Sequence, residues 1–335
     1  VRHPEGPFGD HYGYYSLRHD YPVFRVEEVF HRADAIYPAT VVGKPRQEDF
    51  FIGDYLQDLL SPLISGLMPS VIDLWSYGET GYHSLAAARV RERYKREAMM
   101  SAFRILGEGQ LSLTKFLLII DKAEDLRDFR STLQHVLCRT RTETDLYVFS
   151  NLSMDTLDYT GPRVNQGSKG VWLGLGDPVR ELPSEFGRVT DVPVGLGEVR
   201  VFCPGCLVVG GPTFEADPVA GRRFAEHPAF RQWPLLVLTD EPKRTAASAV
   251  NFLWTTFTRF EPASDLYAQC VSPRKNHICY EMPILIDARR KMGFPEELHC
   301  SSETSEQVSS RWQEYFPSGV EMGDSESAHL DPVGD

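Results

Sequence analysis

The sequence predicts an α+β or α/β fold in which a β-rich start is followed by helices and then by an α/β region. Three observations carry this prediction. β-branched and aromatic residues alternate in part within residues 1–50, leucines take up helical spacing from Gly53, and short apolar runs alternate with helical stretches from Lys115 onward. With 335 residues, the chain is long enough for about two domains and a sizeable core.

The first hundred residues contain the signals for two strands and two helices. Strands are expected over residues 22–30 and 36–42, which are rich in β-branched and aromatic side chains. The leucine spacing over residues 56–64 predicts a first helix, which Pro62 must either kink or begin. A second helix is expected over residues 84–107, because a serine at its start and a glycine at its end suit the two caps.

The α/β region contains an internal sequence repeat. Its expected strands are short apolar runs at residues 116–120, 146–149, 171–175, 235–238, 266–268 and 284–286, with helices at 127–136 and 246–256. Five residues recur 120 positions later: Leu133, Arg139, Asp145, Leu146 and Tyr147 match Leu253, Arg259, Asp265, Leu266 and Tyr267. We infer two related β-α-β units, most simply two halves of one parallel or mixed sheet.

Charge and composition exclude several classes of protein. The 47 acidic and 35 basic residues leave a formal net charge of −12, which disfavours a nucleic-acid partner. An apolar fraction of 42% excludes wholesale disorder, and no apolar run approaches the ~20 residues of a transmembrane segment. Six cysteines in a chain this long do not make a disulfide scaffold, so we expect a reducing, cytoplasmic compartment.

Two carboxylates near the start of the chain are the first candidates for chemistry. Glu5 and Asp10 stand five residues apart in the segment EGPFGD. Its glycines allow a close approach of the backbone to a ligand, and its proline stiffens the turn. Such a loop suits general acid/base work, in which one acid stays ionised while burial raises the pKa of the other. On spacing alone, however, a surface turn with two solvated acids is the commoner arrangement.

Two groups of residues could hold a metal. The first, near the start of the chain, follows no spacing typical of a metal site, so we expect no metal there: His3, Glu5, Asp10 and His11. The second is Cys203-Pro-Gly-Cys206, which runs into strand-like sequence. Structural packing is favoured for this pair, with two alternatives: a redox pair, or half of a zinc site closed by Cys279, His299 or Cys300.

Lys115 directly precedes the apolar run 116–120. A lone lysine at the start of a strand usually extends its ammonium group to solvent. The same group could instead reach a phosphate as a point charge. The sequence alone favours the first interpretation and leaves the second open.

The segment from Glu5 to Tyr15 and the segment over residues 37–49 (YPATVVGKPRQED) resemble the UbiD family of decarboxylases in order and separation. The resemblance continues to about Pro295 and includes TRFEPASD and IDAR. That family uses prenylated FMN to add or remove CO₂ on aromatic and α,β-unsaturated acids, and the cofactor performs the hard chemistry. The resemblance therefore implies a carboxy-lyase, a small aromatic acid as substrate, and a flavin prenyltransferase that supplies the cofactor.

The resemblance also implies roles for four residues. Glu5 would belong to a network that handles the carboxylate, and Asp10 would be the proton donor. Lys115 would reach the flavin phosphate, and Ile52 would line the hydrophobic substrate pocket. The family's partner arginine, its flavin-binding loop and its Mn²⁺ and K⁺ ligands lie N-terminal to Glu5. We therefore expect this chain to be the C-terminal portion of an enzyme, with no metal ligands of its own and inactive alone.

Within the family, the sequence of this chain is similar to those of the subgroup assigned to menaquinone biosynthesis. The expected substrate is therefore a hydroxynaphthoate or hydroxybenzoate, with the 4-hydroxy-3-polyprenylbenzoate of ubiquinone biosynthesis as the alternative. Tyr12 and Arg46 depart from the threonine and proline usual in the family, and could change the shape or charge that the site accepts.

The family's fold implies a division of the chain into four parts. Residues 1–52 would end a split β-barrel that binds the flavin, and residues 53–107 would be connecting helices. Residues 108–300 would form the α/β domain that builds homo-oligomers, and residues 301–335 a helical or disordered tail. A non-catalytic α/β oligomerisation module and a zinc-stabilised binding domain are the competing functions.

Overall fold

The computed structural model describes residues 1–37, 42, 48–187, 189–299 and 301–320. The chain forms two compact units, which are described separately. The first unit comprises Val1–Ile52 together with the described residues from Pro295 onward, and the second comprises Gly53–Phe294. None of the helices in these described ranges is long and apolar enough to cross a membrane.

The first unit contains a small antiparallel sheet. Strand β1 (Arg2–Glu5) pairs with β2 (His19–Pro22), and Glu5 lies opposite His19. Helices α9 (Ser302–Ser310) and α10 (Trp312–Tyr315) belong to the same unit. The β1–β2 pair is the only sheet among the described residues of this unit, and these residues form no closed barrel.

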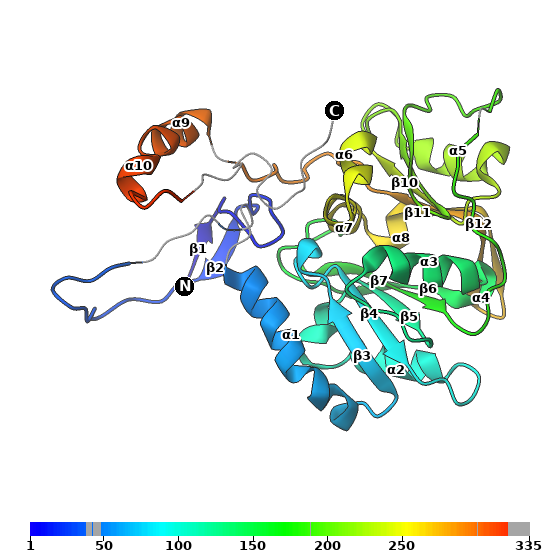
Figure 1. Cartoon of the computed structure of the whole chain (residues 1–335), viewed down its shortest axis with the longest axis horizontal. Coiled ribbons are helices and arrows are strands. Elements are labelled where there is room, and N and C mark those ends of the chain that lie inside the picture. Colours follow the sequence, from blue (N-terminus) through cyan, green and yellow to red (C-terminus); the bar gives the residue numbers. More distant parts are fainter. Residues whose placement is uncertain (38–41, 43–47, 188, 300, 321–335) are drawn as a thin grey trace. The chain divides into compact units, whose positions relative to one another are not determined.

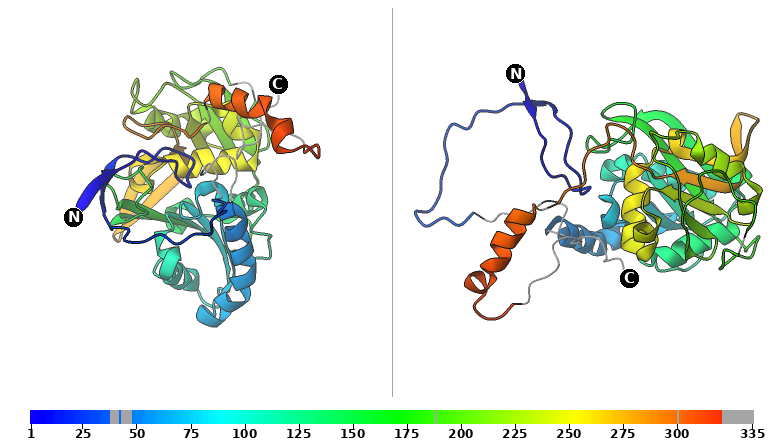
Figure 2. Two further views of the ribbon diagram at one scale, coloured as in Figure 1. Left: turned by 90° about the vertical axis from the view of Figure 1, so that its left-hand side faces the viewer. Right: turned by 90° about the horizontal axis from the view of Figure 1, so that it is seen from above.

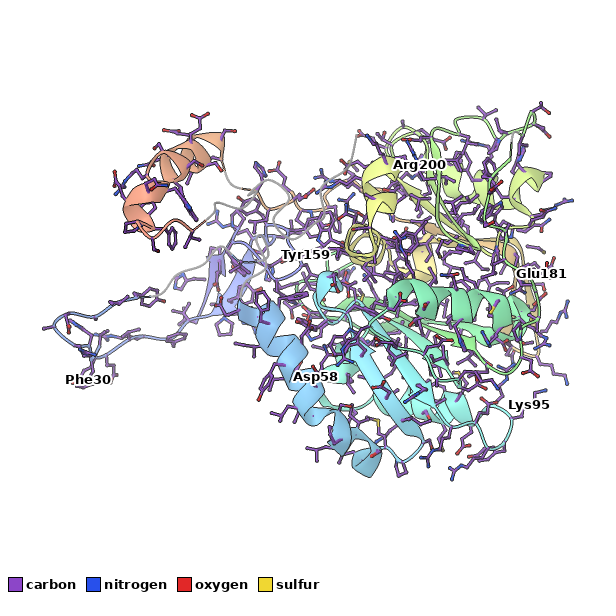
Figure 3. All side chains as sticks on the ribbon, in the orientation of Figure 1. Phe30, Asp58, Lys95, Tyr159, Glu181 and Arg200 are labelled. Atoms are coloured by element: carbon purple, nitrogen blue, oxygen red, sulfur yellow. The ribbon has the colours of Figure 1, made fainter. Side chains whose placement is uncertain are left out.

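The strand predicted over residues 22–30 is wrong beyond Pro22. Residues 23–37 are in neither a helix nor a strand. Phe24 and Phe30 are exposed, so the alternation of apolar residues there covers no core; Figure 3 labels Phe30 on this extended segment. The strand predicted over residues 36–42 lies mostly outside the described residues.

Helix α1 (Glu48–Leu67) confirms the first predicted helix, although it begins earlier than Gly53 and contains Pro62 in its interior. None of its residues is buried. Asp58, labelled in Figure 3, forms an ion pair with Arg127 of the second unit's α/β part.

The helix predicted over residues 84–107 is wrong in its first half. Leu85–Val90 forms strand β4, and the helix α2 covers only Glu97–Ile105. The three alanines of this strand are fully buried in the middle of a sheet. Their intrinsic helix propensity of a few tenths of a kcal/mol is overridden by burial against the neighbouring strands.

The first of two five-stranded sheets in the second unit has the order β3-β4-β5-β7-β6. Strands β4, β5 and β7 are parallel, and the two outer strands run antiparallel to their neighbours. The remaining strands of this sheet are β3 (Val71–Ser76), β5 (Phe116–Ile120), β6 (Leu146–Ser153) and β7 (Gln166–Gly174).

The second sheet has the order β8-β9-β10-β12-β11, with the same pattern of directions. Its strands are β8 (Val199–Cys203), β9 (Cys206–Gly210), β10 (Leu235–Thr239), β11 (Leu266–Arg274) and β12 (His277–Asp287). The two predicted β-α-β units are therefore confirmed. The prediction that they are halves of one sheet is wrong, because each unit forms a sheet of its own.

Two helices lie in the core that joins the inner faces of both sheets: α3 (Phe129–Arg139) and α7 (Ala249–Arg259) (Figures 1 and 2). On the outer faces, α2 packs on the first sheet and α5 (Ala220–Glu226) on the second. The shorter elements are α4 (Thr142–Asp145), α6 (Pro242–Ala247), α8 (Pro262–Asp265), η1 (Gly78–Thr80), η2 (Gly109–Leu113) and η3 (Pro228–Phe230).

Candidate functional site

Asp10 is buried in the loop that follows β1, with 2% of its surface exposed. Its Oδ1 accepts hydrogen bonds from the backbone N–H groups of Tyr12 at 2.8 Å and Tyr14 at 3.4 Å. The Asp10 N–H donates to the carbonyl of Tyr14 at 2.9 Å, so the loop closes around this side chain. The carboxylate is thus held in one orientation by the backbone of its own loop.

Glycine at position 6 fits the close packing of this loop. Gly6 has φ +100°, in the region that favours glycine. A Cβ there would lie 3.1 Å from Oγ of Ser16 and 3.2 Å from the carbonyl oxygen of Leu17. Oγ of Ser16 accepts the N–H of Phe8 at 3.1 Å. A side chain at Gly6 would therefore disturb the contact that closes the loop before Asp10.

Glu5 ends β1 and is exposed, unlike Asp10. The two predicted acids therefore belong to the same unit but differ in environment, as a pair with separate roles requires. A surface turn with two solvated acids describes Glu5 but not Asp10. The roles assigned to the two acids remain predictions.

Lys115 is buried in the second unit, where its Nζ lies 2.7 Å from Oδ2 of Asp158. The side chains of both residues are at most 3% exposed. The Oγ1 of Thr160 lies 3.4 Å from Nζ of Lys115 and donates to Oδ1 of Asp158 at 2.6 Å. The prediction that this lysine extends to solvent is therefore wrong, since its ammonium group is inside the protein. Its contact with a flavin phosphate remains a prediction.

A second lysine, Lys169 on β7, was not predicted. Its Nζ donates to the carbonyl oxygens of Ser112 at 2.8 Å and Thr114 at 2.7 Å. Burial lowers the pKa of Lys169 to about 8; Asp158 partly opposes this shift, and the charge of Lys115 adds to it. The sequence offers one signal for Lys169. The lysine lies between small residues in a run (GSKGVW) that otherwise predicts a strand.

These side chains gather where the parallel strands of the first sheet begin. Lys115 precedes β5, and Lys169 lies near the start of β7. The two buried ammonium groups lie near the carboxylate of Asp158. Lysine can bind phosphate as a point charge.

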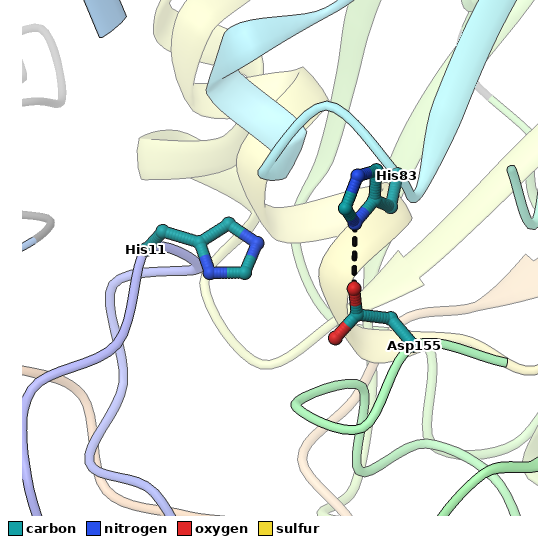
Figure 4. Close-up of side chains that lie close together, drawn as sticks. All are labelled: His11, His83 and Asp155. Atoms are coloured by element: carbon teal, nitrogen blue, oxygen red, sulfur yellow. Dashed lines mark hydrogen bonds and ion pairs between the residues drawn. The ribbon is translucent and has the colours of Figure 1, made fainter. Parts of the chain in front are cut away.

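His83 and Asp155 extend this polar edge. His83 lies just before β4, and Asp155 lies just after β6. Nδ1 of His83 is 2.6 Å from Oδ2 of Asp155, the contact drawn dashed in Figure 4. The carbonyl of His83 accepts the N–H of Lys115 at 2.8 Å, which ties this pair to the start of β5. Neither residue was predicted, because no spacing in the sequence connects positions 72 apart.

Ile52 lies on α1 with 51% of its surface exposed. An apolar hollow of about 390 Å³ lies beside the later part of this helix, lined by leucines such as Leu60 and Leu63. Ile52 does not line that hollow. Its role in a substrate pocket remains a prediction.

Cys203 and Cys206 face each other across the turn between β8 and β9, where Gly205 takes φ +83°. Both are buried free thiols, and burial raises the pKa of Cys206. Among the described residues, neither belongs to a group of three potential metal ligands; Cys300 lies outside them. Both cysteines belong to the core between the two sheets, as the favoured interpretation of structural packing expects, and the zinc and redox alternatives remain predictions.

Comparison with known proteins shows two family models on this chain. The model described as the 3-octaprenyl-4-hydroxybenzoate carboxy-lyase Rift-related domain matches residues 1–45. The model described as the C-terminal domain of the same carboxy-lyase matches residues 50–174. The first of these ends, and the second begins, close to the boundary between the two units at Ile52.

Several relatives match nearly the whole chain, and two of them are described here. An uncharacterized protein of Chlamydia muridarum is 49% identical over 316 residues, which is 94% of this chain and 54% of that protein. A Chlamydia pneumoniae protein named as one of the subunits of 4-hydroxybenzoate decarboxylase is 48% identical over 318 residues, 94% of this chain and 53% of that protein. The chain thus spans about half the length of the curated relatives it matches.

Among solved structures, the closed form of vanillic acid decarboxylase from Sedimentibacter hydroxybenzoicus has a TM-score of 0.47 and 21% identity. That match covers 58% of this chain and 40% of the other. The two family models, which together cover residues 1–45 and 50–174, carry the assignment. The chain belongs to the UbiD family.

Proposed function

We propose that the complete protein to which this chain belongs removes CO₂, reversibly, from an aromatic or α,β-unsaturated acid with prenylated FMN. Membership of the UbiD family supports this activity, as does the name of the Chlamydia pneumoniae relative, which refers to a 4-hydroxybenzoate decarboxylase. The observation that carries the proposal is the burial of Asp10 in the family's acidic motif, with its carboxylate fixed by backbone donors.

Asp10 is the proposed proton donor. When bound, the prenylated flavin supplies an electron sink for the carbon that loses CO₂. The backbone N–H groups of Tyr12 and Tyr14 donate hydrogen bonds to Oδ1 of Asp10, so the proton would be held at Oδ2. A proton placed in this way is delivered to one carbon from one direction, and burial keeps water from competing with it. Glu5 would act in the network that handles the carboxylate.

The buried lysines of the second unit are the proposed site for the phosphate of such a cofactor. Lys115 and Lys169 place two ammonium groups near Asp158, and this supports the proposal because lysine binds phosphate as a point charge. Lys115 is the residue proposed to hold it. By the family resemblance, Mn²⁺ and K⁺ would be bound by residues N-terminal to Glu5, and a flavin prenyltransferase would supply the cofactor.

The proposed substrate is a hydroxynaphthoate or hydroxybenzoate of quinone synthesis, in menaquinone biosynthesis first and in ubiquinone biosynthesis as the alternative. The family resemblance and the named relative support this class. We further propose a cytoplasmic homo-oligomer, for which the composition and the family's α/β domain are the support.

Replacing Asp10 in the full-length, cofactor-loaded protein tests the mechanism. Asp10→Asn keeps the acceptor for the two backbone donors but removes the acid, so turnover should fall about 10²–10⁴-fold while flavin binding is retained. Asp20→Asn changes an exposed carboxylate of the same unit and serves as the control. Unchanged turnover in Asp10→Asn, with flavin retained, would remove Asp10 from this role.

A further inference from the structure

The two sheets of the second unit have equivalent strands in equivalent register. Phe116 of β5 is paired with Leu85 on one side and Gly170 on the other. Leu235 of β10 is paired with Cys206 on one side and Ile284 on the other. The antiparallel edge strands follow the same rule, because Leu146 pairs with Trp172 and Leu266 pairs with Ile286. Matching order, direction and register in the two five-stranded sheets indicate a duplication.

Local contacts repeat as well. Oδ2 of Asp145 accepts the N–H of Arg141 at 2.7 Å, and Oδ2 of Asp265 accepts the N–H of Glu261 at 2.8 Å. Each of these carboxylates also pairs with a cation from outside its helical turn, Arg96 in the first case and Lys291 in the second. Asp145 and Asp265, which are matched in the 120-residue repeat of the sequence, therefore make equivalent contacts in the two copies.

The contacts between the copies are reciprocal. Helical turn α4 of the first copy packs on β12 of the second, and α8 of the second packs on β7 of the first. Nε2 of His277 on β12 lies 3.1 Å from the carbonyl of Glu143, and Oγ of Ser168 on β7 accepts the N–H of Ala263 at 2.8 Å. Reciprocal use of the same elements is the property of a two-fold symmetric dimer interface.

One core fills the space between the copies. The ring of Phe116 in the first sheet lies 6.1 Å from that of Phe257 on α7, and Phe129 on α3 lies 5.7 Å from Phe252. These rings come from both copies and belong to one buried cluster. The inner face of each sheet is covered partly by a helix of its own copy, α3 or α7, and partly by side chains of the other copy, so the core is complete only when both copies are present.

The copies differ in charge at the edge where the parallel strands begin. Lys115 and Lys169 stand there in the first copy. Backbone bonding places Pro234 and Pro283 at the equivalent positions, since Ile284 donates to Pro234 as Gly170 donates to Lys115. Both prolines are buried and carry no charge. The family's C-terminal model also matches the first copy only, ending at residue 174.

We propose that residues 199–287 are a second copy of the α/β unit of residues 71–174, retained as a built-in pairing partner of the first. The second copy covers the inner face of the first sheet in the manner of a symmetric dimer. It has prolines where the first copy has Lys115 and Lys169, so the two buried ammonium groups belong to the first copy. This surface of the first copy is therefore occupied by the chain itself rather than by a second chain.

Hydrogen exchange on the whole protein tests the pairing. Phe257→Ala removes a second-copy ring that packs on the first sheet, and should lower the protection of β5 and β7 amides by roughly 100-fold. Phe224→Ala removes an equally buried ring from the outer core of the second copy and should lower the protection of those amides less. Protection of β5 and β7 that stays at the wild-type level in Phe257→Ala would overturn the proposal.

A cut between the copies gives a second test that needs no core substitution. Residues 189–192 are exposed in the connection between β7 and β8, so a protease site can be inserted between Thr190 and Asp191. After cleavage, the amides of β5 and β7 should keep the hydrogen-exchange protection that they have in the intact chain. Mass alone does not test the pairing, because residues 13–15 and 296–298 of the first unit also join the two pieces. Loss of protection in β5 and β7 after the cut would contradict a built-in partner.

Discussion

Lys169 is a buried side chain whose position the sequence does not predict. Lysines are among the least buried residues, so the residue type argues against an interior position. Only its place within the strand-like run GSKGVW points to burial. The structure buries it because its ammonium group finds two carbonyl oxygens and lies near Asp158. Asp10 is the opposite case. The glycine-proline motif identified it, but only the structure shows that backbone donors fix its carboxylate.

The lowered pKa of Lys169 has a consequence for stability. In the folded protein this lysine loses its proton near pH 8, whereas in the unfolded chain it does so near 10.5. Between these values the unfolded chain binds more protons, so the contribution of Lys169 to the free energy of unfolding rises with pH. We predict that the free energy of unfolding of the wild type, minus that of Lys169→Met, increases from pH 8 to pH 10.5.

Urea denaturation at several pH values measures this difference. Because other lysines and tyrosines titrate in the same range, only the comparison with the variant isolates Lys169. A difference that is flat across this range would mean that Lys169 titrates alike in the folded and unfolded chain.

At the scale of elements, strands were predicted well where they are continuous apolar runs and poorly where alanines replaced larger residues. The sequence predicts β5 and β10 almost to the residue, but it predicts part of a helix where the structure has β4. Alanine carries a helix preference but little packing information, so its state is decided by its neighbours. β3 was not predicted because it is an edge strand with a mixed burial pattern, which leaves little periodicity in the sequence.

The contact between α3 and β7 depends on a glycine. A Cβ on Gly174 would lie 2.5 Å from Cα of Val136, so the helix backbone itself would have to move. We predict that Gly174→Ala lowers the free energy of unfolding by about 1–3 kcal/mol. Gly187→Ala, at an exposed position with no atom within 4 Å of its Cβ, should change it by less than about 0.5 kcal/mol. Equal stability of the two variants in urea would show that α3 adapts freely.

At the scale of the whole molecule, the sequence indicated the duplication but not how the copies are arranged. Strands buried on both faces look alike whether they belong to one sheet or to two. The decision rests on α3 and α7, whose apolar faces fill the space between two sheets. Helical periodicity shows that such a face exists but not what covers it.

The difference in length between this chain and its relatives leads to a prediction about cofactor binding. The chain spans about half the length of those relatives, and by the family resemblance the flavin-binding loop would lie N-terminal to Glu5. We predict that residues 1–335 alone, mixed with prenylated FMN and passed through a desalting column, retain less than a stoichiometric amount. Stoichiometric retention, read from the flavin absorbance, would show that this chain holds the cofactor unaided.

The proposed carboxy-lyase activity is tested most directly by CO₂ release. The full-length protein, loaded with prenylated FMN, is incubated with a panel of hydroxybenzoates and hydroxynaphthoates, and the gas and the decarboxylated product are quantified together. The account predicts equal amounts of both from at least one acid of the panel, and none without the cofactor. Protein that retains the prenylated flavin yet releases no CO₂ from any of these acids would contradict it.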